Sequence, residues 1–323
     1  MYVFSSLFKT IKKSIRYKVE NLSGKILCWV KKPKYSNIRR KLVKAKYIDD
    51  NTGFTIINNV DDVYRIMIVF QDFKLIFGFD NIFSLKKLNL SSERNLDQLY
   101  LLSQLTNLTK LDLSDNERNL DQLYLLSQLT NLITLYLGDN KLKSIPSEIC
   151  NLTNLTKLDL SYNKLTCIPS EICNLTSLIK LNLSENNKLT SMSSEIGKLI
   201  HLKELYLEND ALTNIPSEIG NLTSLINLDL SENKLTSIPS EIGNLTSLME
   251  LNLSENKLTS IPSEICKLIS LFELDIYANQ ITSIPSEICN LINLTQLELR
   301  DNELTSKFEK QIKTWFKPGI VYI

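Results

Sequence analysis

The chain has little of what most catalytic and metal-binding sites require. Its 323 residues include one histidine, His201, and no Cys-x-x-Cys pair, so neither a histidine-based triad nor a cysteine-based metal site is expected. There is no glycine-rich phosphate-binding loop, and the acidic residues recur evenly instead of forming a distinctive cluster. We therefore expect a protein that is not an enzyme and that holds no metal and no cofactor.

The chain also lacks long hydrophobic runs. No stretch of 18 or more apolar residues occurs, so no transmembrane helix is predicted. Lysines from Lys9 onward interrupt the first residues, which therefore lack the apolar block of a secretory signal. We expect an intracellular, cytoplasmic protein. Several Asn-Leu-Thr triplets match glycosylation acceptors, and their glycosylation would instead indicate an extracellular recognition protein.

What the chain does contain is a repeat. Six prolines, each within Ile-Pro-Ser-Glu-Ile, stand 23 or 47 residues apart: Pro146, Pro169, Pro216, Pro239, Pro262 and Pro285. A row of asparagines keeps nearly the same interval: Asn116, Asn140, Asn163, Asn186, Asn233, Asn256, Asn279 and Asn302. A period in the twenties with leucines at fixed offsets indicates a solenoid of stacked short repeats.

One unit, residues 225–247, shows how each repeat is expected to fold. Leu228 and Leu230 alternate with polar residues, as in a short strand with one buried face. Asn233 then ends the strand, because its amide can donate to and accept from backbone groups at the turn. Pro239 prevents further strand pairing, and the apolar residues after it have the spacing of a short helix or 3₁₀ turn. A unit this small cannot bury enough surface alone, so neighbouring units must stack.

The pattern LxxLxLxxNxLxxIPxEIxxLxx resembles the leucine-rich repeat family over residues 85–306, in about ten units. The Pro-x-Glu-Ile segment is similar to the intracellular Ras-group repeats of signalling scaffolds. The resemblance implies an α/β solenoid in the form of a horseshoe. Its concave face would be a parallel β-sheet, its convex face short helical or 3₁₀ segments, and its ends would carry caps. It also implies a non-catalytic scaffold or adaptor that binds a protein partner on the concave face.

Several units depart from the pattern. Residues 93–108 and 117–132 repeat the same sixteen residues and replace the proline segment with one that reads as more helical. Asp210 stands at an asparagine position, Asn187 is an extra residue, and Ser193 replaces a proline. We expect local bulges there, with the stack intact.

Four cysteines, Cys150, Cys173, Cys266 and Cys289, occupy a repeat position that is glycine in other units. The alternation predicts a small residue in a tight place, and hence buried thiols. Disulfides between neighbouring repeats are the alternative.

A solenoid needs covered ends. Residues 307–323 are predicted to form the C-terminal cap, and residues 51–84 the N-terminal cap. Around the C-terminal cap, one helical face is expected to carry Phe308, Ile312, Trp315 and Phe316. Residues 320–323 could then lie against the last strand.

Residues 1–50 form a basic arm, with 14 lysines and arginines against 3 acidic residues. Apolar positions over residues 3–22 predict a basic amphipathic helix. The arm could be solvated or extend the cap, or it could bind a membrane surface or an acidic partner. Phosphate contacts to nucleic acid are a further alternative, although no nucleic-acid-binding module accompanies them.

Two alternatives to a simple scaffold depend on residues 1–84. One is the substrate-recognition subunit of a ubiquitin ligase with a divergent adaptor-binding region, although no Leu-Pro-x-Glu opening is present. The other is a membrane-tethered leucine-rich repeat scaffold.

On the concave face that the resemblance implies, the residues between the leucines change from basic to acidic along the stack. Tyrosines are frequent energetic anchors of interfaces. The predicted partner-binding residues are Tyr136, Asp159, Tyr162, Tyr206, Asp229, Phe272, Asp275, Tyr277 and Glu298. The alternative is a polar face that only keeps the sheet soluble.

Overall fold

The computed structural model describes residues 16–22, 25–31, 86–91, 102–116 and 122–323. The chain divides into two compact units. Unit 1 comprises Met1–Asn116 and Leu125–Leu132, and unit 2 comprises Glu117–Tyr124 and Ile133–Ile323.

Unit 2 is a stack of coils, each with one three-residue strand. These strands are β5 (Thr134–Tyr136), β6 (Lys157–Asp159), β7 (Lys180–Asn182), β8 (Glu204–Tyr206), β9 (Asn227–Asp229), β10 (Glu250–Asn252), β11 (Glu273–Asp275) and β12 (Gln296–Glu298). Each pairs in parallel with the next, so that equivalent residues lie side by side. Unit 1 contains a parallel pair of the same kind, β3 (Lys87–Asn89) and β4 (Lys110–Asp112).

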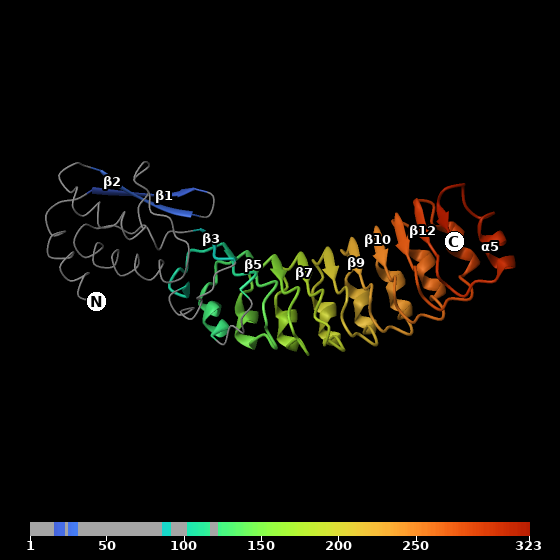
Figure 1. Ribbon diagram of the computed structural model, residues 1–323, viewed down its shortest axis with the longest axis horizontal. Helices are drawn as coiled ribbons and strands as arrows, with labels where there is room; N and C mark the ends of the chain where they lie inside the picture. The colour runs from blue at the N-terminus through green and yellow to red at the C-terminus, as the bar shows by residue number, and fades with distance from the viewer. Residues whose placement is uncertain (1–15, 23–24, 32–85, 92–101, 117–121) are drawn as a thin grey trace. The chain divides into compact units, whose positions relative to one another are not determined.

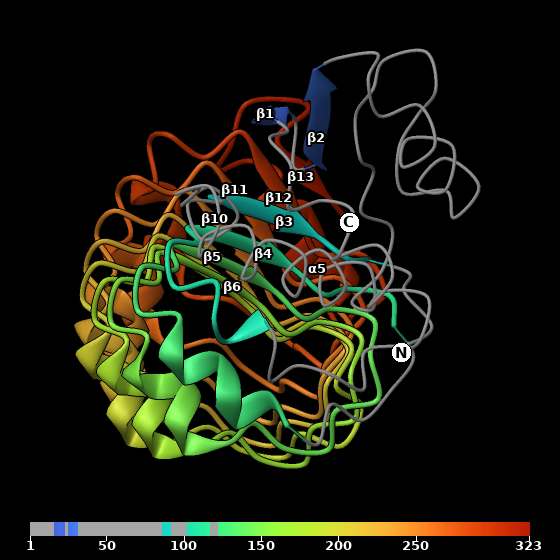
Figure 2. The same cartoon turned by 90° about the vertical axis from the view of Figure 1, so that its left-hand side faces the viewer.

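The return segments are short 3₁₀ helices. They are η3 (Ser147–Asn151), η4 (Ser170–Asn174), η5 (Ser194–Lys198), η6 (Ser217–Asn221), η7 (Ser240–Asn244), η8 (Ser263–Lys267) and η9 (Ser286–Asn290). The longer η2 (Leu123–Gln128) lies in the segment that lacks the proline. In unit 2 the strands line the inner side of a shallow curve and the 3₁₀ helices line the outer side (Figure 1). The view along the stack separates strands and helices again (Figure 2). The predicted fold class is confirmed.

Aliphatic side chains fill the interior of every coil. Leu228 and Leu251, at the centres of β9 and β10, are each 1% exposed, and the leucines and isoleucines at equivalent positions are also buried. Because each coil covers the leucines of its neighbours, the burial that one unit lacks comes from stacking.

Asparagines bind successive coils together just after the strands. The Asn233 amide donates to the carbonyls of Leu230 and Ser231 in its own coil, and to Leu207 of the preceding coil at 2.7 Å. Its oxygen accepts from the Leu212 amide at 3.0 Å. The same two-coil arrangement recurs at Asn163, Asn186, Asn256, Asn279 and Asn302. Asn140 donates to carbonyls of its own turn, and Asn116 donates to its own turn and also to the Leu90 carbonyl of the preceding coil at 3.4 Å.

The position shared by glycine and cysteine lies on the 3₁₀ helices and faces the next coil. A Cβ on Gly220 would lie 2.5 Å from the Glu241 carbonyl oxygen, so this coil has no room for a side chain. Cys150 and Cys173 are free thiols and buried, and burial raises the pKa of Cys150 to about 12. Cys289 is exposed, contrary to the predicted burial.

The irregular coil between β7 and β8 leaves the stack intact, as expected. Lys180 still pairs with Glu204 although the interval between them is one residue longer. The additional Asn187 lies in a turn, so the insertion is absorbed outside the sheet.

The last coil is followed by α5 (Ser306–Ile312) and by β13 (Val321–Tyr322), which pairs in parallel with β12. Ile312 is fully buried. The predicted helical face was too long, because α5 ends before Trp315 and Phe316. The Trp315 amide donates to the Ile312 carbonyl in a tight turn, and the aromatic residues before Lys317-Pro318 favour ending the helix.

The N-terminal helix predicted over residues 3–22 is wrong for residues 16–22, and residues 3–15 lie outside the described residues. Residues Arg16–Leu22 form β1, which pairs antiparallel with β2 (Lys25–Lys31). The alternation of Tyr17 and Val19 with charged residues suits a strand. Residues 51–84, the expected N-terminal cap, lie outside the described residues.

Candidate functional site

The outward-facing residues of β5 to β12 form a continuous surface, here called the strand face. The middle residue of each strand points into the core. Its two neighbours are half-buried or exposed in β5 to β11, whereas in β12 the last residue, Glu298, is buried as well. The last strand residue also ends the strand. The Asp229 carboxylate accepts from the Ser231 amide at 3.0 Å and from its hydroxyl at 2.6 Å. Asp159 makes the same pair of bonds with Ser161.

Sequence reasoning missed these bonds, although Asp-x-Ser or Asn-x-Ser after a strand is a known signal for such turns. The bonds fix each carboxylate over its own turn. These carboxylates of the strand face are therefore already fixed before a ligand binds, which favours binding because they lose little conformational entropy.

Six of the nine predicted partner-binding residues share one row of the strand face. They are Tyr136, Asp159, Tyr206, Asp229, Asp275 and Glu298. Tyr136 and Tyr206 are three strands apart, or roughly 14 Å at the usual strand spacing. The tyrosines therefore do not form a single cluster.

The other three predicted residues lie beside the strands. Tyr162 is in the turn after β6, with a left-handed backbone (φ 53°) and a side chain 58% exposed. Its amide donates to the Ser184 carbonyl of the next coil at 2.9 Å, which holds this conformation. Tyr277 follows β11 and Phe272 precedes it.

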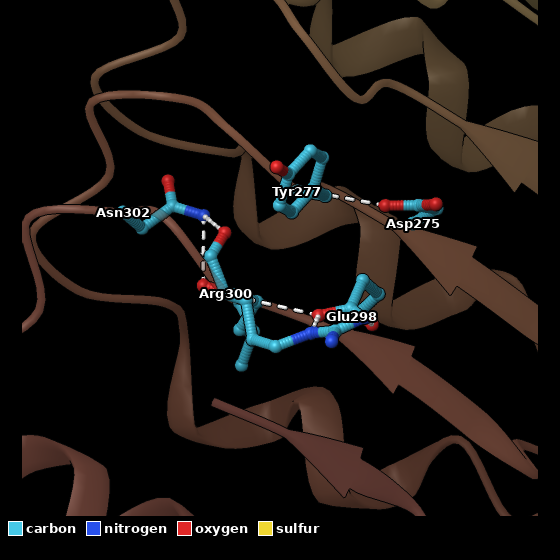
Figure 3. A network of polar contacts seen from close by, with 6 residues as sticks. Asp275, Tyr277, Glu298, Arg300 and Asn302 are labelled. Carbon is cyan, nitrogen blue, oxygen red and sulfur yellow. Dashed lines mark hydrogen bonds and ion pairs between the residues drawn. The ribbon is translucent and has the colours of Figure 1, made fainter.

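Glu298 is not the exposed contact that was predicted. The residue is 5% exposed, and the guanidinium of Arg300 binds both of its carboxylate oxygens, with Nε at 2.8 Å and an Nη nitrogen at 2.6 Å (Figure 3). The pKa of Glu298 is lowered, because the bonds from Arg300 together outweigh the effect of burial. Arg300, whose side chain is largely exposed, is the charged group that this coil presents to solvent.

Three polar side chains form a cluster where the first residue of the strand changes from basic in β7 to acidic in β8. Lys180 Nζ lies 2.7 Å from a Glu204 carboxylate oxygen and 4.4 Å from the centre of the Tyr206 ring. The Tyr206 hydroxyl donates to the same carboxylate at 3.1 Å. The lysine bond lowers the pKa of Glu204. Sequence reasoning placed these residues in neighbouring columns but did not predict their contact.

Beyond this group, the strand face is acidic. A hollow of about 170 Å³ over β8 to β11 is lined by Tyr206, Asp229, Glu250, Glu273 and Asp275, among others. Burial raises the pKa of Glu273, and the nearby carboxylates of Glu250 and Asp275 raise it further. These carboxylates therefore repel one another, and a cationic ligand would relieve the repulsion.

The described residues contain no group of three or more histidine, cysteine or acidic side chains that could hold a metal ion. Within the same part of the chain, no helix has both the length and the hydrophobicity needed to cross a membrane.

Comparison with known proteins places the repeats in a family. The leucine-rich repeat region family matches residues 181–314, and a second leucine-rich repeat family matches residues 119–165 and 130–189. No curated protein matches the sequence significantly.

Three similar solved structures are also leucine-rich repeat proteins or receptors. A leucine-rich repeat protein of Leptospira interrogans is 28% identical with a TM-score of 0.57, over 77% of this chain and 87% of that one. The ectodomain of the Arabidopsis thaliana receptor kinase GASSHO1/SCHENGEN3, in complex with Casparian strip integrity factor 2, is 33% identical with a TM-score of 0.60, over 67% of this chain. The plant peptide hormone receptor RGFR1, in complex with RGF2, is 31% identical with a TM-score of 0.50, over 69% of this chain.

This chain spans 27% of the first receptor chain and 45% of the second. The Ras-group resemblance is not tested by these matches and stays a prediction. The repeat period, the parallel strand ladder and the matching families together show that the chain belongs to the leucine-rich repeat family.

Proposed function

We propose that this protein is a non-catalytic scaffold or adaptor that binds a protein partner on the strand face of unit 2. The observation that carries the proposal is the strand face itself. It is a row of polar and aromatic side chains, most of them half-buried or exposed, over a leucine interior, and turn bonds fix carboxylates such as Asp159 and Asp229 within it. Binding to such a surface loses little conformational entropy.

Two comparisons support a protein or peptide ligand. The two plant receptors similar to this chain were solved in complex with Casparian strip integrity factor 2 and with RGF2. An intracellular location belongs to the proposal as well. The ubiquitin-ligase and membrane-tether alternatives depend on residues 1–84, most of which lie outside the described part of the chain.

The test is affinity purification with the full-length protein. The triple variant Tyr136→Ala/Tyr206→Ala/Tyr277→Ala removes two tyrosines of the strand face and one that lies beside it. We expect recovery of the specific partner to fall at least tenfold, because buried tyrosines are common hot spots of interfaces. Tyr124→Ala is the matched control, since Tyr124 is an exposed tyrosine on η2. Undiminished recovery by a triple variant that still unfolds cooperatively would refute the proposal.

A further inference from the structure

Four large apolar side chains lie exposed beside the acidic part of the strand face. Met249 is 45% exposed, Phe272 50%, Ile269 59% and Ile292 84%. The Phe272 amide donates to the Met249 carbonyl at 2.7 Å, so these two residues occupy neighbouring coils. The Asn293 side chain reaches the Ile269 carbonyl at 2.8 Å, which makes Ile269 and Ile292 neighbours as well. We call Met249, Ile269, Phe272 and Ile292 the apolar flank.

Such a grouping calls for an explanation, because the other aliphatic positions of these coils are almost all buried. Exposed apolar side chains that gather on adjacent coils, with polar residues around them, mark interaction surfaces more often than single exposed residues do. A molecule that covered the apolar flank would remove these side chains from solvent contact.

The apolar flank continues directly into the acidic residues. Met249 precedes Glu250 and Phe272 precedes Glu273, and the two glutamates are partners in the β10–β11 pairing. Glu250 accepts a hydrogen bond from the Asn227 side chain. Within the described residues, neither glutamate forms an ion pair with a lysine or arginine. The strand face therefore presents unneutralised carboxylates one residue away from apolar anchors.

We infer that β9 to β11 and the apolar flank together form a docking surface for a lysine- or arginine-rich segment of a partner protein, with large apolar residues next to its charges. This inference rests on the proposed function and names the chemistry of its partner. Cationic side chains would pair with Glu250, Glu273 and the aspartates of the hollow. The apolar residues of the same segment would cover Phe272 and its neighbours.

A second copy of this chain fits the surface less well. A symmetric dimer through the apolar flank places the same surface of both copies face to face. The carboxylates of Glu250 and Glu273 would then approach those of the other copy, and like charges across an interface oppose association.

The experiment uses the full-length protein and fluorescein-labelled synthetic peptides. The probe is a 12-residue peptide of alternating lysine and leucine. A second peptide carries glutamate in place of lysine, and a third carries serine in place of leucine. Fluorescence anisotropy should give a dissociation constant at least tenfold lower for the lysine–leucine peptide than for either other peptide. Raising the salt concentration should weaken that binding.

Paired variants locate the binding. Glu250→Gln/Glu273→Gln should weaken binding of the lysine–leucine peptide at least tenfold, and so should Ile269→Ser/Phe272→Ser. Glu264→Gln/Glu287→Gln makes the same charge change on η8 and η9 and should alter binding less than twofold. Ile200→Ser is the apolar control. Ile200 is 50% exposed, as Phe272 is, but it lies three coils before Ile269. Circular dichroism melting verifies that each variant is folded.

Equal affinity for the glutamate peptide, or equal losses in the control variants, would overturn the inference. So would a dimer in sedimentation equilibrium that Ile269→Ser/Phe272→Ser dissociates, because the occupant would then be a second copy. If the tyrosine variant loses its natural partner while Glu250→Gln/Glu273→Gln retains it, the proposed function stands and this inference fails.

Discussion

Asp210 occupies a position at which six other coils of unit 2 use an asparagine to join two coils. One carboxylate oxygen accepts from the Asn186 amide at 2.8 Å. The other, Oδ2, is buried and has no hydrogen-bond partner among the described residues. Equivalent asparagines place an NH₂ group there and donate to carbonyls, as Asn233 does. A protonated carboxyl could donate in the same way, whereas a carboxylate could not.

Burial raises the pKa of Asp210 to about 8 from an ordinary value of 3.8, although the bond from Asn186 opposes this. Between about pH 4 and 8 the unfolded chain loses this proton while the folded protein keeps it. The contribution of Asp210 to stability is therefore complete below pH 4, falls across this window and levels off above it.

Asp210→Asn should stabilise the protein by an amount that grows as the pH rises from 4 to 8. The asparagine restores the donor and does not titrate. The gain should reach a few kcal/mol, because each pKa unit corresponds to about 1.4 kcal/mol. Thermal unfolding of both proteins across this pH range measures the difference.

Asp139→Asn makes the same chemical change on an exposed side chain. Comparing its melting temperature with that of Asp210→Asn at each pH separates the effect of burial from the general effect of replacing aspartate by asparagine. A constant difference between Asp210→Asn and wild type from pH 4 to 8 would mean that Asp210 is ionised in the folded protein.

At the scale of the element, a proline stands immediately before most of the 3₁₀ helices. The backbone angle φ of this residue is −57° at Pro285 and −68° at Pro262, and it is −70° at Ser193, which replaces proline before η5. Ser193 therefore already has a backbone that proline can adopt. A small cavity of about 20 Å³ is lined by Met192, Ser193 and Ile196, among others.

Ser193→Pro should raise stability by about 0.5 kcal/mol, because proline restricts the unfolded chain and fits the native backbone. The gain is reduced by loss of the bond that the Ser193 hydroxyl accepts from the Glu195 amide at 3.2 Å. Urea unfolding should show an ordering of Ser193→Pro, wild type and Ser193→Ala from most to least stable. A proline variant less stable than the alanine variant would mean that the ring does not fit this coil.

At the scale of the whole molecule, each coil is stabilised by its interfaces with the neighbouring coils. In unit 2 the last repeat strand, β12, pairs with β13, and α5 lies between these two strands in the sequence. Ile312 is the fully buried residue of α5, so its loss should act mainly on the coils nearest to it.

Ile312→Ala should lower local stability by about 2–5 kcal/mol, the usual cost of removing a large buried aliphatic side chain. In hydrogen exchange with mass spectrometry, peptides that cover β11 to β13 should lose protection, whereas those that cover β6 to β8 should keep it. Lys313→Ala, an exposed neighbour, should change neither region. An equal loss of protection along unit 2 would show that it unfolds as one cooperative block.

The sequence by itself determined the kind of fold, because the fold follows from a pattern repeated along the chain. Leucine and isoleucine at fixed offsets require a buried interior, proline requires the strand to end, and a unit of 23 residues cannot be stable without neighbours. Asn233 could be recognised as a turn residue for the same reason. The N-terminal helix was predicted wrongly because residues 16–22 suit a strand as well, and the choice depends on their partner, β2.

Only the tertiary structure decided which surface residues act together. The contact of Lys180 with Glu204 and Tyr206, the burial of Glu298 beneath Arg300, and the grouping of Phe272 with Met249 all depend on positions in space. Most of these contacts join residues of neighbouring coils, so they follow from the register in which coils stack. Side-chain contacts of that kind have no signature in the local sequence, because the repeat gives every coil the same backbone and leaves the surface residues free to vary.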